Sequence, residues 1–207
     1  MRRACAAAAI VAAVVFVAAR ADAQTLIDRV VVRINDDIIT QSDVSQARLL
    51  HLAPPEAVSD NAIVEALVNR RLMLAEIARG PATEPTTAEL AARRQEWQAT
   101  LGPQANVQEL LRRTGMTDAL LDGWLRDDVR IQAYLERRFL ASTVPRREEL
   151  LKYYDDHPTE FVRAGVRIPF DEAQDEIRKK IAAQRRASNI ARWLDSLRAR
   201  ADIVYIR

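Results

Sequence analysis

The chain has 207 residues and sets 31 Lys and Arg residues against 29 Asp and Glu residues, a formal net charge of +2. Its only cysteine is Cys5, so the rest of the chain has no thiol, which excludes thiol catalysis, disulfides and cysteine-based metal sites there. A chain of this size buries roughly 70% of its unfolded surface on folding, so a hydrophobic core suffices to hold it.

The first 23 residues have the layout of a secretory signal peptide. Two arginines precede an unbroken apolar run, residues 4–19, and Ala21 and Ala23 place small residues where a signal peptidase recognises them. We predict cleavage after Ala23 and an exported protein. The alternative is an uncleaved membrane anchor, but the run is shorter than the ~20 residues that span a bilayer.

Removal of this segment changes the charge balance of the protein. Three of the 31 basic and one of the 29 acidic residues lie in it, so residues 24–207 carry 28 of each sign. Because the exported chain is then neutral, its charge gives no support for binding nucleic acid. The sequence also has no Gly-rich phosphate loop, so we expect no nucleotide and no cofactor.

The exported chain begins with a predicted strand and continues as helices. Residues 27–34 are β-branched and partly alternate in polarity, which is typical of a strand. A turn at 35–37 leads to a short extended piece at 38–39. Thr40 and Asp43 then have the spacing of a capping box that opens a helix. The pattern stays helical almost to the end of the chain, so we predict a mainly α fold.

Glycine and proline mark the helix ends, because glycine tolerates a left-handed cap and proline cannot continue a helix. Gly80, Gly102 and Gly115 each follow a predicted helix, and Thr86 with Glu89 forms a second capping box. The predicted helices begin near residues 40, 60, 86, 106, 117, 145 and 171, and an irregular segment at 157–169 precedes the last one.

Helical spacing of apolar residues predicts which faces are buried. The helix at 62–78 is apolar on most sides, so we expect it to be central. The helix at 117–142 has one apolar face formed by Leu120, Trp124, Ile131, Leu135 and Phe139. The last helix has one stripe along its whole length, formed by Ile177, Ile181, Gln184, Ala187, Ile190, Leu194 and Leu197.

A second predicted strand, residues 203–206, lies at the opposite end of the exported chain from the first. Isolated strands leave their backbone groups unpaired, so the simplest solution is an antiparallel pairing of the two. That pairing would bring the last helix back onto the N-terminal helices and close a single domain. The alternative is two unpaired extended tails.

The sequence offers no active site, so we predict no catalytic, cofactor-binding or metal-binding residue. We interpret His51 as a partly buried or capping side chain, and His157 follows an acidic pair in a turn. A metal site would need a second imidazole or a thiolate at ligand spacing, and none exists. The pairs at 127–128 and 155–156 point about 100° apart on a helix, which favours a solvated face over paired acid–base chemistry.

Aromatic side chains are the remaining candidates for binding. Most should be core, since aromatic residues dominate core energetics. Tyr153 and Tyr154 are better surface candidates, because adjacent helical positions are not expected to face the same core. Such groups in a helical groove could bind extended, unfolded chains. The candidate polypeptide-binding residues are Trp97, Phe139, Tyr153, Tyr154 and Phe161.

Taken together, the segments resemble the SurA family of periplasmic chaperones. The residues at 26–44 are similar to that family's opening strand, turn and first helix, and 66–80 to its central helix. The residues at 169–181 and 191–207 are similar to its closing helix and strand. The stretch ELLKYYDDHPTEF, 149–161, resembles the family's hinge.

The sequence departs from this family at one place. The family carries parvulin-type prolyl isomerase domains between the hinge and the closing helix, whereas here only residues 162–168 separate them. The resemblance therefore implies a chaperone core alone, residues 24–207. Its parts would be an N-terminal helical part (24–157), a hinge (158–169) and a returning C-terminal helix and strand (170–207).

The resemblance implies an ATP-independent periplasmic chaperone whose partners are unfolded exported polypeptides such as outer-membrane proteins. It would be a monomer or a swapped dimer, with no stable membrane insertion after signal cleavage. Two alternatives stay open. One is a diverged prolyl isomerase with an unrecognised site, and the other is a helical adaptor subunit of an envelope complex.

Overall fold

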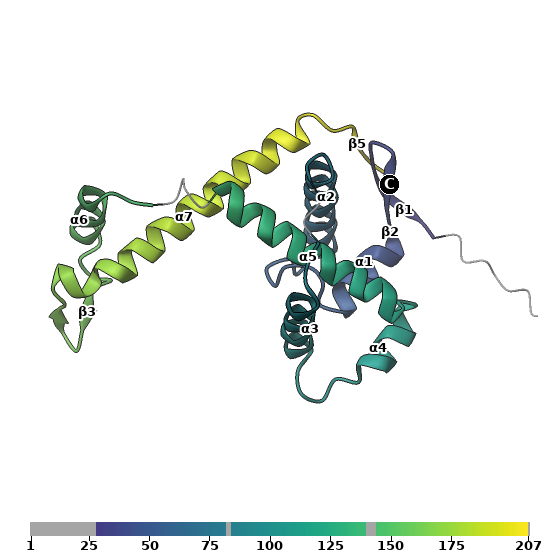
Figure 1. Cartoon of the computed structure of the whole chain (residues 1–207), viewed down its shortest axis with the longest axis horizontal. Helices are drawn as coiled ribbons and strands as arrows, with labels where there is room; N and C mark the ends of the chain where they lie inside the picture. The colour runs from purple at the N-terminus through teal and green to yellow at the C-terminus, as the bar shows by residue number, and fades with distance from the viewer. Residues whose placement is uncertain (1–27, 82–83, 140–143, 207) are drawn as a thin grey trace, which may run out of the picture.

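The computed structural model describes residues 28–81, 84–139 and 144–206, which form a large body and a smaller arm joined by one long helix (Figure 1). We define the body as the described residues of 28–139 together with 190–206, and the arm as residues 144–181. The predicted signal peptide and its cleavage site lie outside the described residues. No helix in the described ranges is long and apolar enough to cross a membrane.

A small antiparallel sheet joins the two ends of the described chain. Strand β1 (Val30–Ile34) lies between β2 (Asp37–Thr40) and β5 (Ile203–Tyr205). The Asn35 backbone N–H donates to the Asp202 carbonyl at 2.8 Å, and the Asn35 side-chain oxygen accepts from the Asp202 N–H at 3.0 Å. The predicted pairing of the terminal strands is confirmed.

The first two helices begin where their capping residues predict. Helix α1 (Gln41–Leu49) starts at the predicted capping box: the Asp43 N–H donates to Thr40 Oγ1 at 3.3 Å, and the Thr40 N–H donates to Asp43 Oδ2 at 2.9 Å. Helix α2 (Asp60–Ile77) packs against α1, α5, α7 and the sheet, which confirms its central place. Its buried side chains are Ile63, Val64, Leu67, Val68, Leu72 and Ile77.

Three further helices complete the N-terminal part of the body: α3 (Thr87–Leu101), α4 (Val107–Thr114) and α5 (Asp118–Phe139). The capping box of Thr86 opens α3 as predicted. Gly115 ends α4 at φ 66°, a left-handed conformation that glycine adopts without strain. Under these helices lies a second core, formed by Leu50, Trp97, Leu111, Met116, Leu121 and Leu125.

The predicted apolar face of α5 is wrong at its first residue. Leu120 is 60% exposed, and its neighbour Leu121 is fully buried instead. The reason is that α5 changes partners along its length. Its beginning packs on the second core, whereas its end, with Ile131 and Leu135, packs on the core shared with α2 and α7. A helix with different partners at its two ends buries different faces there.

The arm is a helix and a hairpin wrapped on the first half of the last helix. Helix α6 (Arg147–Asp156) precedes β3 (Val162–Arg163) and β4 (Val166–Arg167), which pair across a turn at Ala164 and Gly165. The predicted irregular segment is therefore a hairpin, which short-range polarity patterns did not reveal. The arm core consists of Leu150, Phe161, Ala173, Ile177 and Ile181.

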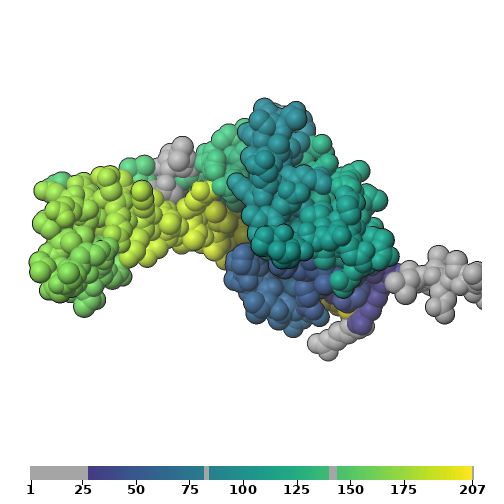
Figure 2. All heavy atoms as spheres, turned by 90° about the horizontal axis from the view of Figure 1, so that it is seen from below, coloured from purple at the N-terminus to yellow at the C-terminus, as the bar shows by residue number. Residues whose placement is uncertain are grey.

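Helix α7 (Phe170–Arg198) connects the arm to the body, and Figure 2 shows it running from yellow-green in the arm to yellow at the body. Its first half belongs to the arm core, and Trp193 and Leu197 belong to the body core. Between them Gln184 and Ala187 are exposed, so the predicted continuous stripe is wrong at these two positions. They lie where the helix has left one core and has not yet reached the other.

The return of α7 onto the body is fixed by polar contacts as well as by the core. Arg198 forms an ion pair with Glu65 at 2.7 Å and donates from Nε to Asn69 Oδ1 at 2.8 Å, both on α2. Between α6 and α7 the described chain holds only the short hairpin.

Candidate functional site

Two of the predicted polypeptide-binding residues are core residues. Trp97 is 1% exposed and its indole N–H donates to the Leu50 carbonyl oxygen at 2.7 Å. Phe161 is fully buried at the centre of the arm. Neither ring offers a surface to a ligand, so their prediction as contact residues is corrected. Their size makes them the natural filling of these two small cores.

The two adjacent tyrosines of α6 both pack on the arm core, contrary to the expectation that only one would. The Tyr153 hydroxyl donates to Glu160 at 3.2 Å, and its ring stacks on His157 with centroids 4.0 Å apart. Burial, followed by the negative charge of Glu160, raises the pKa of Tyr153. The Tyr154 hydroxyl donates to the Ile168 carbonyl. Both rings are half-buried because the hairpin and α7 pack against α6 on two sides.

Phe139 is the one predicted residue that lies beside a surface depression. It is 9% exposed, and its ring packs edge-on to Trp193 with centroids 5.9 Å apart. The structure thus brings Phe139 to a site that the other four predicted residues do not share.

That site lies where the C-terminal ends of α2 and α5 approach α7. A cleft of about 330 Å³ is lined by Ile77, Gly80, Pro81, Arg130, Tyr134, Arg137 and Arg138. A second depression of about 490 Å³ is lined by Arg138, Phe139, Asn189 and Arg192. Because Arg138 lines both, the two are neighbours, and we call them together the trough.

The apolar lining of the trough comes from α2 and α5. Tyr134 and Phe139 of α5 line it, and Ile77 adds an apolar side chain from the last turn of α2. Behind this lining, the Tyr134 ring stacks on the buried Trp193 of α7, with centroids 5.5 Å apart and planes inclined by 30°. Aromatic pairs at this spacing stabilise the contact between two elements beyond the area they bury. From α7 the trough receives the polar side chains of Asn189 and Arg192.

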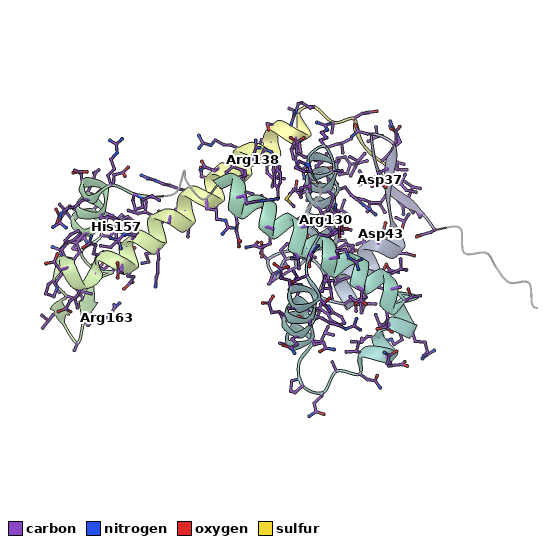
Figure 3. The ribbon with its side chains drawn as sticks, in the orientation of Figure 1. Asp37, Asp43, Arg130, Arg138, His157 and Arg163 are labelled. Carbon is purple, nitrogen blue, oxygen red and sulfur yellow. The ribbon has the colours of Figure 1, made fainter. Side chains whose placement is uncertain are left out.

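Arginines form the rim of the trough, and no described lining residue is acidic. Arg138 donates to the Tyr134 hydroxyl at 3.2 Å, and its guanidinium carbon lies 5.5 Å from the Trp193 ring centre. Figure 3 places it where α5 crosses α7. Arg130, which also lines the cleft, forms ion pairs with Asp127 at 3.5 Å and with Glu84 at 3.9 Å.

Two buried donors beside the trough have no acceptor among the described residues, namely Arg130 Nε and Trp193 Nε1. Buried polar atoms are nearly always paired, so an unpaired one calls for an explanation. Both atoms are donors, and both lie beneath the surface of the protein, out of reach of a ligand in the trough.

The two histidines contact backbone carbonyl oxygens and do not form a catalytic pair. His51 has φ 50°, and its Nδ1 lies 3.0 Å from the Thr100 carbonyl oxygen. His157 caps α6, with Nδ1 2.9 Å from the Tyr153 carbonyl oxygen. Among the described residues no group of three or more His, Cys, Asp or Glu side chains is arranged to hold a metal ion.

The acidic pair of α5 is not a solvated face, which corrects the sequence interpretation. Asp128 is 17% exposed and forms ion pairs with Arg70 of α2 and Arg93 of α3. Its neighbour Asp127 lies near Arg70 and Arg130. The pair belongs to the contact among three helices, where the partners come from segments distant in sequence. The other pair, at 155–156, is exposed as predicted.

Sequence reasoning missed the arginines and Tyr134 of the trough. A local signal existed, because Tyr134 and Arg138 are four residues apart and so share one helix face. Nothing local indicated that Trp193, far along the chain, would complete that face.

Comparison with models of known protein families finds no match, and a search of curated proteins finds no significantly similar sequence.

Proposed function

We propose that the protein is an ATP-independent chaperone that holds unfolded exported polypeptides, and that the trough is its binding surface. The observation that supports this best is an open depression on the body, lined by Ile77, Tyr134 and Phe139 where α2 and α5 approach α7. A concave site lined by apolar and aromatic side chains offers a contact for the apolar groups of a partner. The sequence resemblance to the SurA chaperone core points to the same class of partner.

The chemistry of the trough suits weak and general binding. Aromatic faces accept many apolar side chains, and arginine stems add further apolar contact. Ordering a flexible chain costs free energy that a shallow surface only partly offsets. We therefore expect low affinity for each segment and fast exchange, which suits a protein that must release its client.

A light-scattering assay tests the proposal. An unfolded porin is diluted from urea with the exported chain in molar excess and no nucleotide, and we expect slower aggregation. Tyr134→Asn should weaken the effect, because it removes an aromatic side chain from the trough. Leu120→Asn is the matched control, since Leu120 is an exposed apolar residue on the same helix outside the trough. Unchanged aggregation with the wild-type chain would contradict the proposal.

A second candidate function is an adaptor for one defined envelope partner. The observation that favours it is a row of exposed apolar side chains on the sheet: Ile38, Val204 and Ile206 are 45%, 40% and 43% exposed. Crosslinking in cells separates the two. One dominant product attached to the sheet favours the adaptor, and a broad distribution of products favours the chaperone.

A further inference from the structure

The charge of the side chains that line the trough limits which polypeptide segments it can bind. Four arginines line it, and no acidic side chain is among the described lining residues. One of the four, Arg130, is ion-paired with Asp127 and Glu84. The exported chain as a whole has equal numbers of acidic and basic residues. Positive charge is thus concentrated here against an otherwise balanced background.

Arg138, which is exposed, differs from the partly buried arginines of the body. Arg70, Arg94 and Arg198 each form an ion pair with a carboxylate. Arg138 forms none with the described residues. Its guanidinium lies instead 5.5 to 5.8 Å from the centres of the Trp193, Phe139 and Tyr134 rings. Stacking on aromatic faces orients the planar group without neutralising its charge.

The charge of Arg138 determines which charge a bound segment should carry. Arg138 is exposed and lines both depressions, so a ligand in the trough can reach its guanidinium group. A carboxylate placed there would form a charge-assisted hydrogen bond. A basic segment would bring like charge, which is unfavourable.

We propose that the trough selects polypeptide segments in which Asp or Glu lies beside a large apolar side chain, with the carboxylate on Arg138 and the apolar group against Tyr134 and Ile77. This inference rests on the proposed chaperone function and names its preferred client chemistry. An extended chain is the occupant because the two depressions share Arg138 and are open, whereas a small-molecule site encloses most of its ligand.

Direct binding of labelled peptides tests the selection. Three peptides share one sequence of aromatic and aliphatic residues and differ at a single position, which is Glu, Gln or Lys. Fluorescence anisotropy with the exported chain should show the Glu peptide binding about tenfold more tightly than the Gln peptide, as one charge-assisted hydrogen bond would give. The Lys peptide should bind most weakly, and added salt should reduce the preference.

Substitutions of single arginines show which side chain gives the preference for Glu over Gln. Arg138→Gln should remove the preference for Glu over Gln while leaving the affinity for the Gln peptide nearly unchanged. Arg113→Gln is the control, since it removes one exposed positive charge outside the trough, on α4. Arg192→Gln gives a second test at the other end of the trough, and circular dichroism verifies that each variant keeps its helices.

The outcomes separate this inference from the proposed function. If the wild-type chain slows porin aggregation but binds the three peptides equally, the selection is overturned and the chaperone function stands. If it neither slows aggregation nor binds any peptide, both fall. Arg138-dependent binding to vesicles containing phosphatidylglycerol, with no preference among the peptides, would also overturn the selection.

Discussion

Asp128 shows how a single side chain joins three helices of the body. It accepts from Arg93 Nη2 at 2.7 Å and forms an ion pair with Arg70, whose side chain is only 13% exposed. Arg70 also lies over the Trp124 ring at 4.0 Å and donates to the Trp124 carbonyl at 2.8 Å. Burial lowers the pKa of Arg70, and the charge of Asp128 opposes that shift.

Replacing Asp128 with Asn should therefore destabilise the body strongly. It leaves two partly buried guanidinium groups facing each other without their shared carboxylate. We expect the free energy of unfolding to fall by about 3 kcal/mol, measured by urea denaturation. Asp122→Asn is the control on the same helix, because Asp122 is 50% exposed in its pair with Arg94 and should cost less than about 1 kcal/mol. Equal losses would show that Asp128 has no special role.

Glu160 has in the arm the role that Asp128 has in the body, because its carboxylate binds side chains of other elements. The stability of the arm should therefore depend on pH. Its hydrogen bond from Lys180 is the main cause that lowers the pKa of Glu160 below its ordinary value of 4.5. A carboxylate with a lowered folded-state pKa stabilises the fold fully above its unfolded pKa, and that stabilisation is lost as pH falls through the folded pKa. The arm should accordingly weaken as pH falls below about 4.5.

Hydrogen exchange of arm amides as a function of pH measures this. At neutral pH, Glu160→Gln should exchange faster than the wild type, and the two should converge as pH falls below about 4.5. Glu148→Gln, an exposed acid of α6 without an ion-pair partner among the described residues, should behave as the wild type does. A difference between Glu160→Gln and the wild type that persisted at low pH would contradict the assignment.

At the scale of elements, α7 is the part on which the architecture depends. Trp193 is 6% exposed in the body core and stacks on Tyr134, and Arg198 ties the end of the helix to α2. The strand that follows completes the sheet against β1. The C-terminal half of α7 thus packs in the body core, and its N-terminal half packs in the arm core.

Replacing Trp193 with alanine should weaken the packing of α7 on the body. Trp193→Ala removes a buried aromatic side chain, and we expect it to lower the free energy of unfolding by about 4 kcal/mol. Ser188→Ala, at an exposed position in the same helix, should change it by less than about 0.5 kcal/mol. Thermal and urea denaturation of both variants test this, and a mild effect of Trp193→Ala would mean that the end of α7 docks only loosely.

At the scale of the whole molecule, the arm and the body have separate cores. The arm core draws on α6, the hairpin and the first half of α7, and the body cores contain none of these residues. Cooperative unfolding follows shared buried contacts, so two cores joined by one helix should open separately.

Phe161→Ala should open the arm alone. Loss of this fully buried ring costs about 3–5 kcal/mol, which should exceed the stability of so small a unit. Hydrogen exchange followed by mass spectrometry should then lose protection over residues 144–181 while α2 stays protected. Trp97→Ala is the reciprocal variant and should affect α3, α4 and α5 first. Uniform loss of protection in either variant would show a single cooperative unit.

The sequence by itself determined several helix ends and the closure of the chain, although α2 ends at Ile77 and not at the predicted cap, Gly80. Capping boxes at Thr40 and Thr86, the left-handed cap at Gly115 and the β-branched terminal strands are local features, and the structure confirms each of them. Local patterns suffice here because caps and propensities act within a few residues of the chain.

Only the tertiary structure decided which side chains form the trough and which are core. Trp97 and Phe161 are equivalent in the sequence to surface aromatics, and burial became visible only once distant segments packed on them. Asp128 and Arg138 are both charged residues of α5, yet one finds partners on two other helices and the other finds aromatic rings. Contacts between segments far apart in sequence set these differences, and no periodicity within one helix encodes them.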